Sequence, residues 1–376
     1  MKEGWRYKKL GEVCEILDSK RKPITKEKRE AGDIPYYGAT GCLDFVKNYI
    51  FDEKLVLLGE DGAKWGAGEE SAYIIEGKSW VNNHAHTLRP KRSILIDEFM
   101  VYYLNYSNLQ SYITGVTVPK LNQEKMRSIE IPVPPLSEQH SIVARLDAAF
   151  SHIDALKANA EKQLNEARKL FQAELTECMR PKEGWEEKTL KEVSEIAGEY
   201  GLNASSKPFD GVRYLRITDI TDFGYLNDDK VSANVEDGKK QDELVEGDIL
   251  FARTGATVGK TLVYRKDFGD CLFAGYLIRY RLKKDCILPR FIHYITHSKE
   301  YYKWVETNQE AAAQPNISAK KYNMLFIRYP NIDVQHRIVS HLDSLSSTIR
   351  KLEELQQKTL AECDALKQAM LREVFE

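Results

Sequence analysis

Several polar loops of the chain carry side chains that could recognise DNA. Residues 19–30 hold six lysines and arginines in twelve positions. In the major groove, arginine and lysine pair with guanine, and asparagine and glutamine pair with adenine. In the first half of the chain, the candidate contacts are Lys20, Arg21, Lys22, Tyr37, Thr40, Lys64, Trp65, Asn82, Asn83, His84, His86, Lys120 and Asn122. In the second half they are Arg213, Arg216, Thr218, Arg253, Thr254, Thr257, Lys260, Tyr276, Gln314 and Asn316.

Two other patterns resemble catalytic or metal-binding motifs without meeting their requirements. Residues 254–261 resemble a phosphate-binding loop, but three residues separate Gly255 from Gly259 where that motif needs four. The apolar residues that follow predict a strand and not the helix that such a loop precedes. His84 and His86 offer two imidazoles, with no third ligand at a suitable spacing. We therefore expect no active site, no metal and no cofactor bound by this chain.

Composition limits the class of protein and the compartment. The chain has 376 residues, with 55 Lys+Arg against 57 Asp+Glu and a net charge of −2. A free-standing DNA binder is usually basic, so strong binding is expected to use a local basic face or a partner's charge. The six cysteines form no Cys-x-x-Cys pair, which favours free thiols over a zinc cluster or disulfides. No apolar run suits a membrane helix or signal peptide, so a cytoplasmic protein without a membrane partner is expected.

An internal repeat organises the sequence. Residues 2–16 recur as 182–196 with ten of fifteen positions identical, at an offset of 180. Residues 139–147 recur as 335–343, but at an offset of 196. The second globular stretch is therefore longer, and the middles, 17–130 and 197–326, are only weakly alike. This pattern favours one scaffold that carries two different recognition inserts, although an old duplication whose middles drifted without purpose is the alternative.

The expected architecture is α+β, with two strand-rich globular units. Apolar runs bounded by turn residues predict strands in both units. The predicted strands are 54–58, 72–75, 129–133, 248–252, 261–264 and 275–281. Shorter helices are expected near 96–105 and 289–298.

A long helix is predicted after each unit, over 137–179 and 332–374. Each follows a proline-containing segment, and each has apolar residues at alternating steps of three and four, as in a coiled coil. The predicted seam consists of Ile142, Leu146, Ile153, Leu156, Leu170, Ile338, Leu342, Leu345, Ile349, Leu352 and Leu366. The simplest way to bury both stripes is an antiparallel pair, about 65 Å long at 1.5 Å per residue, with a unit at each end and the chain termini close together. A tandem array related by translation is the runner-up.

With repeat and helices assembled, the chain resembles the specificity (S) subunit of type I restriction-modification enzymes. The matching sequence segments are Gly4-Trp5, 37–41, 118–122 with its counterpart 314–318, 247–253 and, most specific, 131–142. The second copy, 329–336, departs from the pattern because it lacks the Pro-Pro and the Glu. The resemblance implies target recognition domains at 1–136 and 181–331, a central spacer helix at 137–180 and a C-terminal one at 332–376.

The resemblance also implies a division of labour. The two domains would each read half of an asymmetric, bipartite double-stranded DNA site. Two methyltransferase (M) subunits would bring S-adenosylmethionine, and restriction (R) subunits would bring ATP and Mg. The S chain itself would be non-catalytic.

Two further hypotheses stay open from the residues alone. The near-neutral charge is compatible with a two-headed structural adaptor that does not touch DNA. The glycine loop at 254–261 is the only reason to consider an enzyme. The half-site sequences cannot be derived from the chain, because loop conformation and DNA shape decide them.

Overall fold

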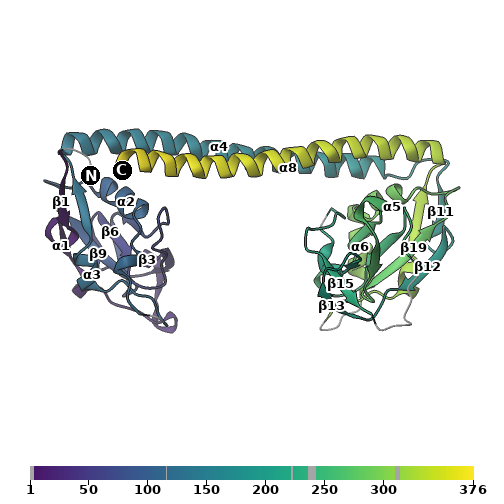
Figure 1. The fold of residues 1–376 in the computed structure, drawn as a ribbon, viewed down its shortest axis with the longest axis horizontal. Helices are drawn as coiled ribbons and strands as arrows, with labels where there is room; N and C mark the ends of the chain where they lie inside the picture. Colours follow the sequence, from purple (N-terminus) through teal and green to yellow (C-terminus); the bar gives the residue numbers. More distant parts are fainter. Residues whose placement is uncertain (1–3, 116, 222, 236–242, 310–313) are drawn as a thin grey trace. The chain divides into compact units, whose positions relative to one another are not determined.

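The computed structural model describes residues 4–115, 117–221, 223–235, 243–309 and 314–376. The chain divides into two compact units (Figure 1). Unit 1 comprises Met1–Glu161 with Leu355–Glu376, and unit 2 comprises Lys162–Glu354. Each unit therefore contains a globular part and a segment of both long helices, instead of the separate helical domains that the sequence suggests.

Unit 1 is built around a four-stranded antiparallel sheet whose central strand is fully buried. The sheet has the order β2 (Cys14–Ile16), β9 (Ala85–Pro90), β6 (Leu55–Gly59), β7 (Ala72–Ile75). A second sheet has the order β4 (Gly41–Val46), β3 (Ala31–Gly38), β8 (Lys78–Val81), β5 (Phe51–Asp52). The continuous apolar run of β6 is explained by its position, because both of its faces are covered.

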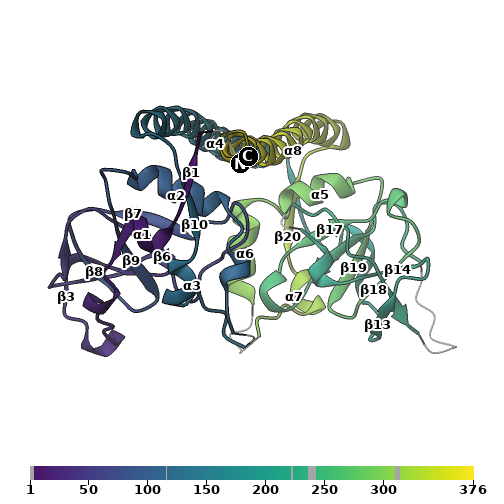
Figure 2. The ribbon, with the colours of Figure 1, turned by 60° about the vertical axis from the view of Figure 1, so that its left-hand side comes forward.

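Short elements close the core of unit 1. β1 (Arg6–Lys9) pairs with β10 (Glu130–Val133), the strand that leads into the first long helix. The remaining elements are α1 (Leu10–Val13), α2 (Asp97–Tyr106), α3 (Gln123–Arg127) and 3-10 turns at Asp18–Lys20, Lys26–Lys28 and Gln110–Tyr112. α2 lies between the four-stranded sheet and the long helices (Figure 2).

Unit 2 repeats the main sheet strand for strand. Its order is β12 (Ser194–Tyr200), β19 (Leu277–Leu282), β16 (Ile249–Ala252), β17 (Thr261–Val263), and β11 (Glu186–Thr189) pairs with β20 (Phe326–Tyr329). The insert differs, with pairs β13 (Ser205–Pro208)–β15 (Val231–Asn234) and β14 (Arg213–Leu215)–β18 (Cys271–Phe273). The helices are α5 (Pro289–Ile295), α6 (Lys299–Asn308) and α7 (Ala319–Asn323), with 3-10 turns at Ile217–Asp219, Gly255–Thr257 and Lys266–Phe268. Helix α6 was not predicted and has no matching helix among the described residues of unit 1.

Both long helices are present, as α4 (Leu136–Cys178) and α8 (Ile332–Phe375). In unit 1, Arg145 pairs with Glu373 and Lys157 pairs with Asp364. In unit 2, Arg168 pairs with Glu353 and His341 pairs with Glu174. In both units, residues with higher numbers on α4 pair with residues with lower numbers on α8. The expected antiparallel pairing is therefore confirmed in each unit (Figure 1).

The predicted seam is correct at some positions and wrong at others. Ile142, Leu146, Ile153 and Leu342 are buried, and Ile338, Leu345, Ile349 and Leu352 are half-buried. Leu156, Leu170 and Leu366 are 57 %, 72 % and 51 % exposed, so they do not belong to the seam. Near Leu170 and Leu366 the helices also pack on their globular units, which places the buried stripe on a different face of each helix. Leu146 and Leu371 join the core of unit 1, and Leu175 and Leu342 pack with Tyr294 in unit 2.

The two ends of the described chain meet in unit 1. The rings of Trp5 and Phe375 lie 6.4 Å apart, and Phe99 of α2 packs against both. The Trp5 indole also donates to Glu138 at 2.9 Å. The expected proximity of the termini is thus confirmed, and it fastens the end of α8 to the first unit. Among the described residues, no helix combines the length and the apolar character that a bilayer crossing needs.

Candidate nucleic-acid interface

The loop after the central strand has the same construction in both units. β6 and β9 pair in the same register as β16 and β19, which places Gly59 opposite Ala85 and Ala252 opposite Leu277. Three residues later, each loop contains a glycine in the left-handed region, Gly62 at φ +68° and Gly255 at φ +71°. Only glycine adopts this conformation without strain. The turns therefore expose equivalent positions, although their side chains differ.

A second segment closes on each of these loops in the same way. Asp61 forms a β-bridge with Lys120, and Thr254 forms the equivalent bridge with Asn316. Directly after the bridge, the side chains of Asn122 and Ser318 accept hydrogen bonds from the backbone of the following short helix, as N-caps. A third segment joins through backbone bonds from Glu60 N to His84 O and from Arg253 N to Tyr276 O, at 2.8 and 3.0 Å. Three loops thus converge in each unit.

In unit 1 the converging loops carry charges of both signs. Glu60 accepts from Arg21 at 2.6 Å and pairs with Lys120 at 2.8 Å. Burial alone would raise the pKa of the Glu60 carboxyl, but hydrogen bonds from Lys120 and Arg21 hold that pKa below its ordinary value. Asp61 pairs with the exposed His84. Asp61, His84 and Lys120 therefore place a carboxylate, an imidazole and an ammonium group close together, whereas Glu60 itself is buried.

In unit 2 the same positions carry arginine, asparagine and tyrosine. The Arg253 side chain donates from Nε to Asn316 Oδ1 at 3.2 Å, and its guanidinium lies 4.9 Å from the centre of the Tyr200 ring. Arg253 and Tyr200 border a cleft of about 620 Å³ that is also lined by Arg216 and Tyr276. Tyr276 is 57 % exposed. The cleft combines cationic donors with aromatic faces, which suits contacts to bases and phosphates.

The model of the type I restriction modification DNA specificity domain matches residues 2–166 and 182–361. This chain belongs to that family. Among its relatives, a putative type I restriction enzyme specificity subunit, S.HindORF215P of Haemophilus influenzae, is 28 % identical over 93 % of this chain and 89 % of the relative. The EcoKI specificity subunit of Escherichia coli K12 is 25 % identical over 87 % of this chain and 75 % of its own.

Solved structures share the fold across the whole chain. A chain from a structure on complex assembly and conformational transition of the type I R-M system has a TM-score of 0.74, with 20 % identity and coverage of 100 % and 98 %. The HsdS subunit from Thermoanaerobacter tengcongensis has a TM-score of 0.57, with 21 % identity and coverage of 100 % and 97 %. The two family matches fall on the two copies of the repeat, so each unit of the structure contains one specificity domain.

Several candidates from the sequence are buried and cannot contact DNA in this conformation. They are Trp65, Asn82, His86, Arg213 and Thr254. The Trp65 indole donates to Gly59 O at 3.0 Å, and Arg213 donates to the backbone of Asn227 and Asp229. These hydrogen bonds hold Trp65 against the end of β6 and Arg213 against the segment before β15.

His86 shows how the loops of a specificity domain are supported. Its Nδ1 lies 2.6 Å from Asp18, and its Nε2 lies 2.7 Å from Leu121 O, in the segment that bridges to the loop after β6. Asp18, Glu60 and His86 lie close enough to hold a metal ion. Arg21 contacts both of these carboxylates, at 3.3 Å for Asp18 and 2.6 Å for Glu60. A guanidinium thus already provides the positive charge, and Arg21 supports the loop, since its side chain is only 11 % exposed.

The remaining candidates lie at the surface of their specificity domains. Exposed side chains are those of Lys20, Lys22, Thr40, Lys64, Asn83, His84, Thr218, Tyr276 and Gln314. Half-buried ones are those of Tyr37, Lys120, Asn122, Arg216, Arg253, Thr257, Lys260 and Asn316. Sequence reasoning missed Glu60, Asp61 and Tyr200. Glu60 and Asp61 could have been found from the sequence, because they precede Gly62 and Gly66, and glycines with the same spacing recur at 255 and 259.

Proposed function

We propose that this chain is the DNA specificity subunit of a type I restriction-modification enzyme, and that each unit reads one half of a bipartite, asymmetric target. One observation carries the proposal: the three converging loops have the same backbone frame in both units but different side chains. Lys120 and His84 in unit 1 stand where Asn316 and Tyr276 stand in unit 2, and the buried Glu60 stands where the half-buried Arg253 stands. Two different half-sites require the same backbone arrangement in both units with different side chains on it.

The side chains favour different bases in the two half-sites. Arg253 and Asn316 in unit 2 are suited to the acceptor edge of guanine and to adenine, respectively. In unit 1, Asp61 can accept from the amino group of cytosine, and Lys120 can donate to guanine or to a phosphate. Loop shape then selects among these contacts. We therefore expect guanine to be prominent in the half-site that unit 2 reads.

The chemistry of modification and cleavage belongs to other subunits in this proposal. Two M subunits carry S-adenosylmethionine, R subunits carry ATP and Mg, and the specificity chain binds none of these cofactors. The complex acts in the cytoplasm. The net charge of −2 fits this division, because the subunits that surround the DNA add positive charge. Each end of the helix pair would dock one M subunit.

Selection of DNA by the assembled methyltransferase tests this function. The chain is purified with its M subunit and mixed with a library of random duplexes at fixed salt. We expect enrichment of two short motifs separated by an unread gap. Replacing residues 197–326 with the corresponding insert of another family member should change one motif and leave the other intact. Enrichment of one continuous motif, or of none, would contradict the proposal.

The competing hypothesis is a structural adaptor that does not bind DNA. The same preparation of the chain with its M subunit distinguishes the two hypotheses. Affinity for duplex DNA should fall steeply with salt if several lysines and arginines displace counterions from phosphates. An adaptor that does not bind DNA would show no such dependence.

A further inference from the structure

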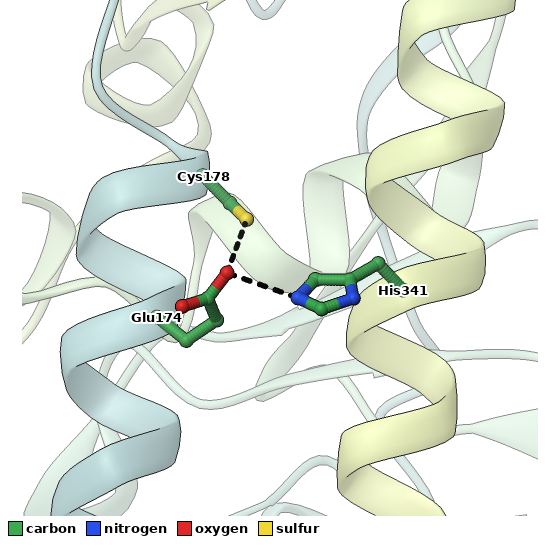
Figure 3. A group of neighbouring side chains, drawn as sticks. All are labelled: Glu174, Cys178 and His341. Atoms are coloured by element: carbon green, nitrogen blue, oxygen red, sulfur yellow. Dashed lines mark hydrogen bonds and ion pairs between the residues drawn. The ribbon is translucent and has the colours of Figure 1, made fainter.

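Three unlike donor groups meet where α4 ends in unit 2. Glu174 and Cys178 project from α4 one turn apart, and His341 faces them from α8 (Figure 3). Glu174 Oε1 lies 2.9 Å from His341 Nε2 and 3.7 Å from Cys178 Sγ. All three ligand atoms lie within 4.8 Å of one another. Sequence spacing does not reveal this cluster, because His341 lies 163 residues beyond Cys178.

We propose that Glu174, Cys178 and His341 form a binding site for a transition-metal ion of the zinc class. Zinc binds thiolate, imidazole and carboxylate at about 2.0–2.3 Å, which places the donor atoms of a tetrahedral site about 3.3–3.6 Å apart. The observed separations bracket these values, so small side-chain rotations complete the site. The set mixes the soft and borderline donors that zinc, cobalt and nickel prefer. Calcium and magnesium, which need oxygen ligands, are not expected to bind.

Packing fixes the backbone of the site and leaves it open to solvent. Leu175 and Leu342, the direct neighbours of two of the ligands, are fully buried and pack together. The ligand side chains face outward, with exposures of 45 % for Glu174 and 51 % for His341. A cavity of about 250 Å³, lined by Cys178, His341 and Trp185 among others, adjoins the cluster. The fourth coordination position can therefore take a water molecule.

Helix pairing alone does not require this donor set. At the repeat offset of 196, the positions of Glu174 and Cys178 correspond to Met370 and Val374 in unit 1. The position of His341 corresponds to Arg145, which pairs with Glu373 instead. The first unit thus joins the same two helices with a different, purely structural set of contacts. The metal ligands belong to one copy of the repeat only.

A bound ion would have a mechanical effect. Two ligands lie on α4 and one on α8, so coordination would link the helices where unit 2 begins. The ion must displace a proton, because burial and the Glu174 charge raise the pKa of the Cys178 thiol to about 11. The link would stabilise the helix pair of unit 2. It does not depend on the proposed function in DNA recognition.

Cobalt binding to the full-length chain tests the site. The protein is treated with a chelator, freed of the chelator and titrated with Co²⁺. We expect one equivalent to produce a near-ultraviolet thiolate-to-cobalt charge-transfer band with the visible absorption of a tetrahedral ion. Cys178→Ser should abolish the charge-transfer band, whereas Cys42→Ser and Cys286→Ser, which alter thiols outside the cluster, should retain it. No band in the wild type, or a band that survives in Cys178→Ser, would overturn the proposal.

A second measurement keeps the test independent of folding defects. Circular dichroism first establishes that the variants keep the wild-type helix content. Zn²⁺ should then raise the melting temperature of the wild type and of His336→Ala, an exposed histidine of α8 outside the cluster. It should not raise that of His341→Ala. An equal increase in both histidine variants would mean that zinc binds elsewhere, and would refute this site.

Discussion

Gln139 and Gln335 make the same three hydrogen bonds, each in its own unit and each at the start of a long helix. Both side chains are fully buried. In each case Oε1 accepts one backbone N–H, and Nε2 donates to two carbonyls, at 2.8–2.9 Å. The partners are Ile94, Ile96 and Pro134 for Gln139, and Cys286, Leu288 and Pro330 for Gln335. One amide thus fastens the helix to the loop before α2 or α5.

Replacing Gln139 with glutamate should destabilise unit 1. The substitution keeps the shape of the side chain but removes the amide donor, and it places an acceptor against the carbonyls of Ile94 and Pro134. Leaving buried groups unpaired costs about 1–3 kcal/mol each, so a loss of about 2–5 kcal/mol is expected. Hydrogen exchange measured separately on the two units should show faster exchange in unit 1 only. Gln163→Glu, at an exposed position of α4, is the matched control and should change little.

Leu170 and Leu175 should differ sharply in their contribution to stability. Both lie on α4 in unit 2, but Leu170 is 72 % exposed and Leu175 is fully buried. Leu175→Ala should reduce the free energy of unfolding by about 2–5 kcal/mol, because it opens a cavity beside Leu342. Leu170→Ala should stay within about 0.5 kcal/mol. Chemical denaturation followed by circular dichroism checks both, and a large loss at Leu170 would restore it to the seam.

Much of the fold follows from periodicity and repetition. Strand 72–75 and both long helices appear in the structure with the predicted bounds to within a residue or two. Which face of each long helix is buried was harder to predict. A heptad pattern assumes one partner, whereas α4 contacts α8 and a globular unit at the same time. Helix α6 was missed because it lies in a stretch with little similarity to the first copy, so the repeat gave no guide.

The candidate site could be located only approximately from sequence. Residue type cannot separate a base-reading group from one that supports the loop, and so His86 and Arg213 were included although both are buried. The loops themselves were identified, because Lys120 and Asn316 lie in matching segments. The bridges from Asp61 to Lys120 and from Thr254 to Asn316 show the pairing that the sequence could not provide. Most of the candidate DNA contacts remain predictions.

Unit 2 should lose stability in mild acid through His293. This ring is buried in α5, where burial, the nearby His297 and Arg290 lower its pKa well below the ordinary 6.5. A lowered pKa in the folded state means that the unfolded chain binds the proton first. The free energy of unfolding of unit 2 is therefore unaffected by His293 above pH 6.5. It decreases as the pH falls below that value, by up to about 1.4 kcal/mol per pH unit. Denaturation of the wild type and His293→Leu between pH 5 and 8 checks this, since the variant should lack this slope; His336→Ala should keep it.

Arg253 should determine one base of the half-site that unit 2 reads. Its guanidinium is positioned by Asn316 and by the Tyr200 ring at the edge of the cleft. Arg253→Ala should weaken binding of the assembled methyltransferase to its selected duplex by about 1–3 kcal/mol and relax the preference at a single position. Lys188→Ala removes a positive charge from β11, outside the lining of the cleft, and should leave that preference unchanged. Competition binding against duplexes changed one base pair at a time measures both variants. Equal weakening on every duplex, without loss of preference, would show that Arg253 contacts phosphate and that another side chain of the cleft reads the base.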